Sequence, residues 1–237
     1  MTASDFVLGF GEAGWGAALL QAAMMTLAVA STGYAFGLLV GSFGAWAKIK
    51  GGVLPRLIAD AYTTVLRGIP DILVIYLFYF GSSAVLTPLA GLFGISGFVS
   101  LPGFMAGALA IGLVSGAYQA EIMRGAYRAV SPGEIEAAIA AGMSRLTMFR
   151  RIIAPLVLRH ALPGLGNVWQ LVLKESALVS VTGLVEILRQ AQIGAGSTGQ
   201  PFTFFFAAAV LYLAISSFST WLLRRTEARL TIGARRA

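Results

Sequence analysis

The sequence lacks several residue types and motifs, and each absence narrows what the chain can do. It contains no cysteine, which excludes disulfide bonds and thiolate metal sites. His160 is the only histidine, so no second imidazole is available for a metal. No Gly-Lys dipeptide occurs, so the phosphate-binding loop of ATPases is missing, and neither H-E-x-x-H nor G-x-S-x-G is present. We therefore expect no metal, no cofactor and no enzymatic activity of its own.

Charge is also scarce. Only 11% of the 237 residues are charged and 57% are hydrophobic, whereas an ordinary soluble domain carries about a quarter charged residues. Such a chain needs the bilayer as its solvent. The formal net charge is +7, but the basic residues lie between apolar runs rather than on one polar face. This pattern favours the positive-inside arrangement of membrane proteins over nucleic-acid binding.

Five apolar runs approach the ~20 residues that a helix needs to cross ~30 Å of hydrocarbon. They predict an all-α membrane protein with spans at 17–46, 57–81, 104–123, 157–183 and 203–223. A further uncharged run, 84–101, is interrupted by Pro88, Gly94 and Gly97. We expect it to form an outer-surface or re-entrant helix rather than a sixth span.

The basic residues predict the direction of the spans. With five spans and the N-terminus outside, the Lys and Arg residues of the first loop, the third loop and the tail all face the cytoplasm. Arg67 and Lys174 fall within spans, and Arg189 alone lies outside. A sixth span would place the third loop or the tail on the wrong side. The predicted organisation is a periplasmic segment 1–16, a membrane domain 17–225 with a cytoplasmic loop 125–156, and a basic cytoplasmic tail 226–237.

Small residues recur at four-residue spacing in two of the spans. Gly33, Gly37 and Gly41 follow this pattern in the first span, and Gly112 and Gly116 follow it in the third. In lipid, such glycines let helix backbones approach closely. We expect close packing there, although membrane helices also tolerate glycine without such a role.

The third loop contains a patterned, basic elbow. Ser131 can cap a helix, and Glu134 three residues later can close a capping box. Gly142 interrupts this helix, and Ser144 can cap a second short helix before Pro155 ends the unit. Such an elbow fits a groove on a partner protein, and it also suits a surface of anionic lipid, which its arginines favour. The spacing alone leaves both interpretations open.

Residues 136–155 read E-A-A-I-A-A-G-M-S-R-L-T-M-F-R-R-I-I-A-P. This segment resembles the E-A-A…G…I-x-L-P signature of permease subunits of binding-protein-dependent ABC importers, with Ala154 where the family usually has leucine. In that family the elbow is a coupling helix inserted into the ATPase subunit, so the resemblance implies the same for residues near 134–150. The residues implied to couple to the ATPase are Glu136, Ala137, Ala138, Gly142, Arg145, Ile152 and Pro155.

Two motifs within the spans resemble the polar amino acid branch of this family. They are R-G-I-P at 67–70 and K-E-S-A-L-V-S at 174–180. R-G-I-P-D-I-L and A-L-P-G-L-G-N-x-W-Q look closest to permease subunits for histidine, basic amino acids and opines. The resemblance implies the type I importer fold and a subunit of the bacterial inner membrane. It also implies half of an ATP-driven path for polar, cationic amino acids or arginine-derived opines. The implied partners are an ATPase dimer, a second homologous permease subunit in a heterodimer, and a periplasmic solute-binding protein.

Four charged residues lie inside predicted spans, where charges are costly and usually functional. They are Arg67, Asp71, Lys174 and Glu175. We predict that Asp71, just after the helix-breaking Pro70, contacts a cationic substrate through charge-assisted hydrogen bonds, with Glu175 as the second candidate. Arg67 and Lys174 are equally suited to substrate contact or to salt bridges, Arg67 with Asp71 and Lys174 with an acid on another helix.

Two further features are expected to be structural. Glu121, near the inner end of the third span, can pair with Arg124 or Arg128. Four phenylalanines open the last span and are expected to mark its outer interface. They are Phe202, Phe204, Phe205 and Phe206.

Two other classes of function compete with the importer. A secondary transporter or channel for small cationic solutes would need no ATPase, but the sequence lacks the internal repeat typical of that class. An intramembrane enzyme is disfavoured because the acids within the spans are not arranged as a catalytic pair.

Overall fold

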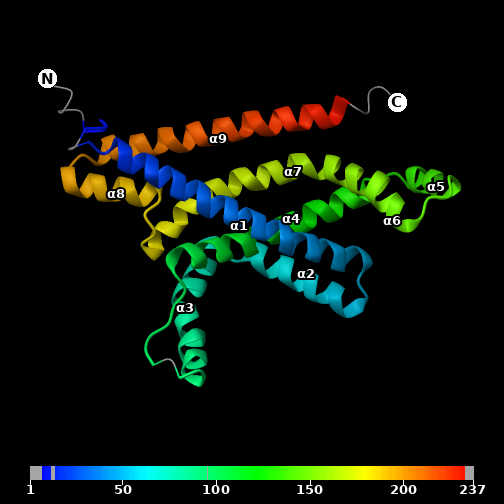
Figure 1. The fold of residues 1–237 in the computed structure, drawn as a ribbon, viewed down its shortest axis with the longest axis horizontal. Coiled ribbons are helices and arrows are strands. Elements are labelled where there is room, and N and C mark those ends of the chain that lie inside the picture. Colours follow the sequence, from blue (N-terminus) through cyan, green and yellow to red (C-terminus); the bar gives the residue numbers. More distant parts are fainter. Residues whose placement is uncertain (1–6, 12–13, 95, 233–237) are drawn as a thin grey trace.

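The computed structural model describes residues 7–11, 14–94 and 96–232, and every regular element within them is a helix. Two long helices, α1 (Gly16–Lys50) and α4 (Gly103–Arg128), lie against each other through the middle of the molecule (Figure 1). α7 (Ala154–Glu175) packs on α4, and α9 (Pro201–Ile232) runs along one edge. The predicted all-α class is confirmed.

The contact between α1 and α4 is made by the spaced glycines. A Cβ atom added at Gly37 would lie 2.9 Å from the Gly112 carbonyl oxygen and 3.1 Å from the Gly116 amide nitrogen. A Cβ atom added at Gly41 would lie 2.8 Å from the Gly116 carbonyl oxygen. Real Cβ atoms do not approach backbone atoms this closely, so only glycine permits this helix separation. The predicted close packing through small residues is confirmed.

We therefore expect Gly37→Leu to disrupt the α1–α4 contact and to lower the stability of the fold by about 1–3 kcal/mol or more, as overpacking does. Gly125→Leu is the matched control, because Gly125 lies on α4 with open space around its Cβ position. The measurement is the yield and thermal aggregation temperature of the detergent-solubilised protein. Equal values for the two variants would contradict this account of the contact.

The predicted second span, 57–81, is divided at Pro70, the residue predicted to break it. The chain forms α2 (Val53–Gly68) and then α3 (Asp71–Leu92), and α3 projects away from the rest of the molecule (Figure 1). Between them Ile69 and Pro70 are extended, with ψ angles of 137° and 132°. Proline disfavours the helical conformation at the residue before it and has no N–H to continue the helical hydrogen bonds. The apolar run continues across this break, so hydropathy does not reveal it.

The predicted separate helix at 84–101 is wrong. α3 continues through Pro88 to Leu92, and the chain then turns back through Gly94 and Gly97, whose φ angles are +77° and +133°. Side chains of α3 hold the returning segment. The Thr87 hydroxyl accepts a hydrogen bond from the Val99 amide at 3.1 Å, and the Ser82 hydroxyl accepts one from the Leu101 amide at 3.1 Å.

Four helices of the described chain, namely α1, α3, α4 and α9, are long and apolar enough to cross a membrane. The predicted spans 17–46 and 104–123 lie within α1 and α4. The predicted span 203–223 lies within α9, which continues as a helix into the first part of the predicted tail. Residues 233–237 of that tail lie outside the described residues, as do residues 1–6, 12 and 13 of the predicted N-terminal segment.

The predicted fourth span, 157–183, is divided in two. α7 ends at Glu175, and a 3₁₀ segment, η3 (Ser176–Thr182), follows. Its tighter winding coincides with hydroxyl groups that donate to carbonyls three residues earlier, Ser176 to Leu173 at 2.7 Å and Thr182 to Val179 at 2.8 Å. α8 (Ile187–Thr198) then leads to α9.

Lys48 is not the loop charge that the sequence suggested. Its side chain is buried where α1, α2 and α4 meet, and its ammonium lies 2.9 Å from the Asp60 carboxylate and 2.5 Å from the Thr63 hydroxyl. It also pairs with Glu121, which in turn binds Arg124 at 2.6 Å. The predicted pairing of Glu121 with Arg124 is confirmed. A buried cation requires such partners.

The four phenylalanines at the start of α9 differ in their exposure. Phe204 is fully buried, and its ring packs edge-on against Trp15 with 5.4 Å between centroids. Phe202, Phe205 and Phe206 are exposed. The prediction of a shared interface is therefore wrong for Phe204, because its place on the helix faces the chain that leads into α1.

Candidate functional site

The fold brings together two of the four charged residues predicted inside the spans. Asp71 is the first residue of α3, directly after the break at Pro70, and Glu175 is the last residue of α7. Their carboxyl groups face each other and interact. Glu175 is buried with 8% of its surface exposed, and Asp71 is partly exposed. The pair thus lies where two helix ends meet.

Apolar packing holds these helix ends in place. Val74 and Ile75, in the first turn of α3, belong to the same buried cluster as Val172 and Leu173, in the last turn of α7. Val179 of η3 joins this cluster and is fully buried. Because close-packed interiors are barely compressible, this packing fixes the two helix ends, and therefore the two carboxyl groups, relative to each other.

The carboxyl pair has no cationic partner among the residues that the structure describes. The ion pairs within the described part of the chain join Lys48 and Arg124 to acids near the C-terminal end of α1. Neither Asp71 nor Glu175 takes part in one. Two adjacent carboxylates repel each other, and burial adds a desolvation cost. A cation with several N–H donors placed beside them would relieve both costs. The site is therefore suited to binding a positively charged group.

Arg67 and Lys174 are not part of this pair. Arg67 is exposed on the last turn of α2, and its guanidinium carbon lies 5.2 Å from the centroid of the Tyr118 ring. Lys174 is exposed and lines a separate cavity of about 430 Å³ together with Tyr212 and Ser216 of α9. Neither of the two salt bridges considered for these cations is present among the described residues.

The predicted elbow is present in detail. α5 (Pro132–Ala140) begins with a capping box, in which the Ser131 amide donates to the Glu134 carboxylate at 3.3 Å. Gly142 reverses the chain with a φ of +70°. Ser144 then caps α6 (Arg145–Met148) by accepting from the Thr147 amide at 3.3 Å. The predicted helix–glycine–helix order is confirmed.

The end of the elbow differs from the prediction. Pro155 does not terminate a unit, because it lies in the first turn of α7. The chain passes from α6 into α7 through one π-helical segment, Phe149–Ile153. A proline in a helix cannot donate to the carbonyl four residues before it, and a wider turn accommodates this loss.

The seven residues implied to couple to the ATPase divide into two groups. Four of them line a surface pocket of about 470 Å³ between α5 and the start of α7, namely Ala137, Ala138, Ile152 and Pro155. Glu136, Gly142 and Arg145 are exposed and lie outside this lining. Large apolar side chains are also exposed on the elbow, namely Ile139, Leu146 and Phe149. Exposed apolar groups of this size are typical of a protein interface.

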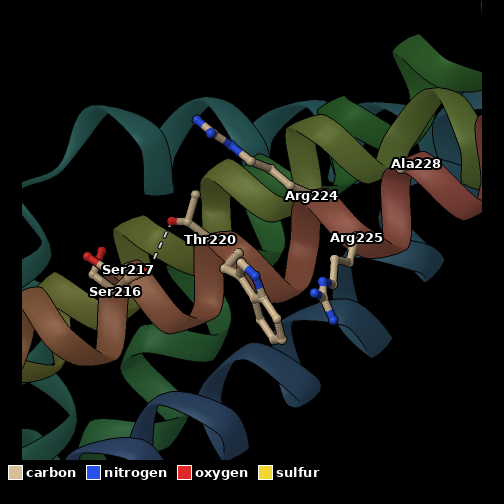
Figure 2. Close-up of a pocket in the computed structure, with 7 residues that line it drawn as sticks. Ser216, Ser217, Thr220, Arg224, Arg225 and Ala228 are labelled. Atoms are coloured by element: carbon tan, nitrogen blue, oxygen red, sulfur yellow. Dashed lines mark hydrogen bonds between the residues drawn. The ribbon is translucent and has the colours of Figure 1, made fainter.

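A basic and aromatic cluster on α9 was missed in the sequence. Trp221, Arg224 and Arg225 line a surface pocket of about 460 Å³ together with Ser216, Ser217, Thr220 and Ala228 (Figure 2). The guanidinium carbon of Arg225 lies 3.9 Å from the centroid of the Trp221 ring. Tryptophan and arginine at the end of an apolar helix are typical of an interfacial anchor, and their adjacency at 221–225 was the available signal.

Comparison with known proteins identifies the family. Residues 33–232 match the family described as binding-protein-dependent transport system inner membrane component. The chain is 57% identical over 230 residues to the octopine transport system permease protein OccQ of Rhizobium meliloti, covering 97% of each chain. It is 38% identical over 224 residues to the histidine/lysine/arginine/ornithine transport system permease protein HisQ of Escherichia coli, covering 94% of this chain and 98% of the relative.

Solved structures agree with the sequence relatives. A chain of an amino acid ABC transporter crystallised with histidines superposes with a TM-score of 0.77 at 33% identity, covering 91% of this chain and 95% of that one. This likeness supports the predicted type I permease fold. The chain belongs to the family of binding-protein-dependent transport system inner membrane components, and it is a multi-pass permease subunit of an ABC importer.

Proposed function

We propose that this subunit forms half of an import path for cationic amino acids or arginine-derived opines, and that Asp71 and Glu175 contact the cationic group of the substrate. The observation that carries the proposal is a pair of adjacent carboxyl groups, one of them buried, without a cation beside it. A guanidinium or ammonium group would supply the missing charge and its hydrogen-bond donors. The relatives named above, for octopine and for histidine, lysine, arginine and ornithine, support this class of substrate.

We infer five membrane crossings, with the N-terminus in the periplasm and the elbow and basic tail in the cytoplasm of a bacterial inner membrane. The broken pair of α2 and α3 makes the second crossing, and α7 makes the fourth. The 22 residues of α7 correspond to about 33 Å, enough for the hydrocarbon core. The cluster of arginines on the elbow and at the end of α9 supports this direction.

The elbow then docks on a separate ATPase subunit, which supplies the energy. The chain itself lacks a phosphate-binding loop, and the elbow exposes apolar side chains beside the signature residues. An ATPase dimer would engage two permease subunits. The second is a homologous and distinct permease subunit, which packs against the exposed apolar surface of α3, and a periplasmic solute-binding protein delivers the substrate. Only 17% of the apolar window of α3 is buried within this chain.

The direct test is reconstitution of the permease pair, its ATPase and its solute-binding protein in liposomes, with radiolabelled arginine and octopine as substrates. We expect uptake of a cationic substrate that requires both ATP and the binding protein. Uptake that persists without ATP and without the ATPase subunit would overturn the proposal and favour a secondary transporter or channel.

A further inference from the structure

A second site lies beside the elbow, away from the carboxyl pair. A groove of about 850 Å³ runs between the ends of α1 and α4 and the first half of α7. On α1 its lining residues include Ser42, Trp46 and Lys50, which share one helix face at four-residue spacing. On α7 they extend from Ala154 to Leu165, which is about 16 Å along the helix axis.

The two ends of this groove differ in chemistry. Toward Leu165 its walls are apolar, whereas Lys50 and Arg145 lie at the end nearest the elbow. The Lys50 ammonium is 6.0 Å from the centroid of the Tyr127 ring, which also lines the groove. No acidic residue is among the described residues that line it, and neither cation is in a described ion pair. Two cations without acids therefore stand at the mouth of an apolar channel.

We propose that this groove binds an anionic phospholipid, with one acyl chain between α1 and α7 and the headgroup phosphate at Lys50 and Arg145. The inference rests on the proposed function in one respect, because it requires the elbow to face the cytoplasmic leaflet. Basic pockets between helices on that side of the membrane are suited to anionic headgroups.

The charges rather than the apolar walls should select the lipid. Bilayer hydrocarbon is as apolar as the groove, so placing an acyl chain there yields little net hydrophobic gain. Attraction of an anionic headgroup contributes about fivefold in affinity for each basic residue near the membrane surface. Phosphatidylglycerol should therefore bind better than phosphatidylcholine with the same acyl chains. Because Arg145 belongs to the elbow, the bound lipid would connect the elbow to α1.

The test is native mass spectrometry of the complete importer released from mild detergent, with phosphatidylglycerol or phosphatidylcholine added. We expect phosphatidylglycerol to be retained selectively. Lys50→Gln and Arg145→Gln should each weaken its retention about fivefold. Arg189→Gln is the matched control, because Arg189 is exposed on α8, at the opposite end of the molecule from α5 and α6 (Figure 1). Ala154→Leu, which narrows the groove without changing charge, should weaken retention as well.

Three results would overturn the proposal. They are equal retention of the two lipids by the wild type, unchanged retention in both charge variants, and retention by the isolated chain but not by the complete importer. The last result would mean that a partner protein fills the groove. Lipid retention is measured without transport, so cationic uptake without selective retention would refute only the lipid site. Selective retention without cationic uptake would refute only the proposed function.

Discussion

Asp71→Asn should reduce uptake of cationic substrates by roughly 10–100-fold in the reconstituted importer. The variant keeps the size of the side chain and one acceptor oxygen, replaces the other oxygen with an amide donor, and removes the charge. A hydrogen bond to a charged group contributes about 1.5–3 kcal/mol, which sets this range. The measurement is the initial rate of ATP-driven uptake across substrate concentrations, normalised to the amount of assembled complex.

Glu175→Gln should have a comparable effect, because the two carboxyl groups face each other and, in the proposed site, would contact the same cationic group. The double variant should lose little more than the worse single variant, as expected for residues that act as a unit. Asp60→Asn is the matched control, since it removes a carboxylate in the middle of α2 while Lys48 keeps its contact with Glu121. Normal cationic uptake by Asp71→Asn at normal expression would remove Asp71 from the substrate path.

The second large effect is expected at Gly142. Gly142→Val should lower ATP-driven uptake by about tenfold or more, because a β-branched residue at a φ of +70° is strongly strained and would change the angle between α5 and α6. Gly142 and the next residue close the end of α5 through hydrogen bonds to carbonyls. The Gly142 amide donates to Ile139 at 2.9 Å, and the Met143 amide donates to Ala138 at 3.1 Å. This is the pattern for which a left-handed residue is needed.

Gly142→Asn separates conformation from side-chain bulk. Asparagine tolerates the left-handed region far better than valine, and open space surrounds the position of a Cβ atom at Gly142. We expect Gly142→Asn to retain most uptake and both variants to insert into the membrane in normal amounts. ATPase activity stimulated by the binding protein should fall together with uptake only in Gly142→Val. Equal uptake by the two variants would show that the reversal at Gly142 is not required for coupling.

The sequence predicted local features well, but it predicted poorly which residues distant in the chain lie side by side. The capping box at Ser131 and the reversal at Gly142 are short-range patterns with strong physical causes, and both are present. The close packing predicted from the glycine spacing is also present, because residues four apart share one helix face. Pro70 likewise predicts the break between α2 and α3, whereas hydropathy averaged over a window passes across it.

The carboxyl pair marks the limit of such reasoning at the site. Asp71 and Glu175 were each selected because charges within spans are costly, yet nothing in their local sequence places them beside each other. Lys174 is adjacent to Glu175 in the chain but faces α9, since successive residues of a helix point in different directions. The burial of Lys48 was also not predictable from its local sequence. A basic residue at the end of an apolar run is usually a loop residue, but in the structure three helices enclose Lys48.

The continuity of α7 has a mechanical consequence. This helix begins at Ala154 beside the elbow and ends at Glu175, so one helix about 33 Å long, with Pro163 inside it, joins the elbow to the carboxyl pair. Asp71 belongs to α3, which is separated from the elbow in the chain by α4. Under the proposed function, a displacement of the elbow would reach Glu175 through α7, and a change in its spacing from Asp71 would require the apolar cluster shared by α3 and α7 to rearrange. In the proposed importer, α7 would therefore link the ATPase contact at one end to the cation site at the other.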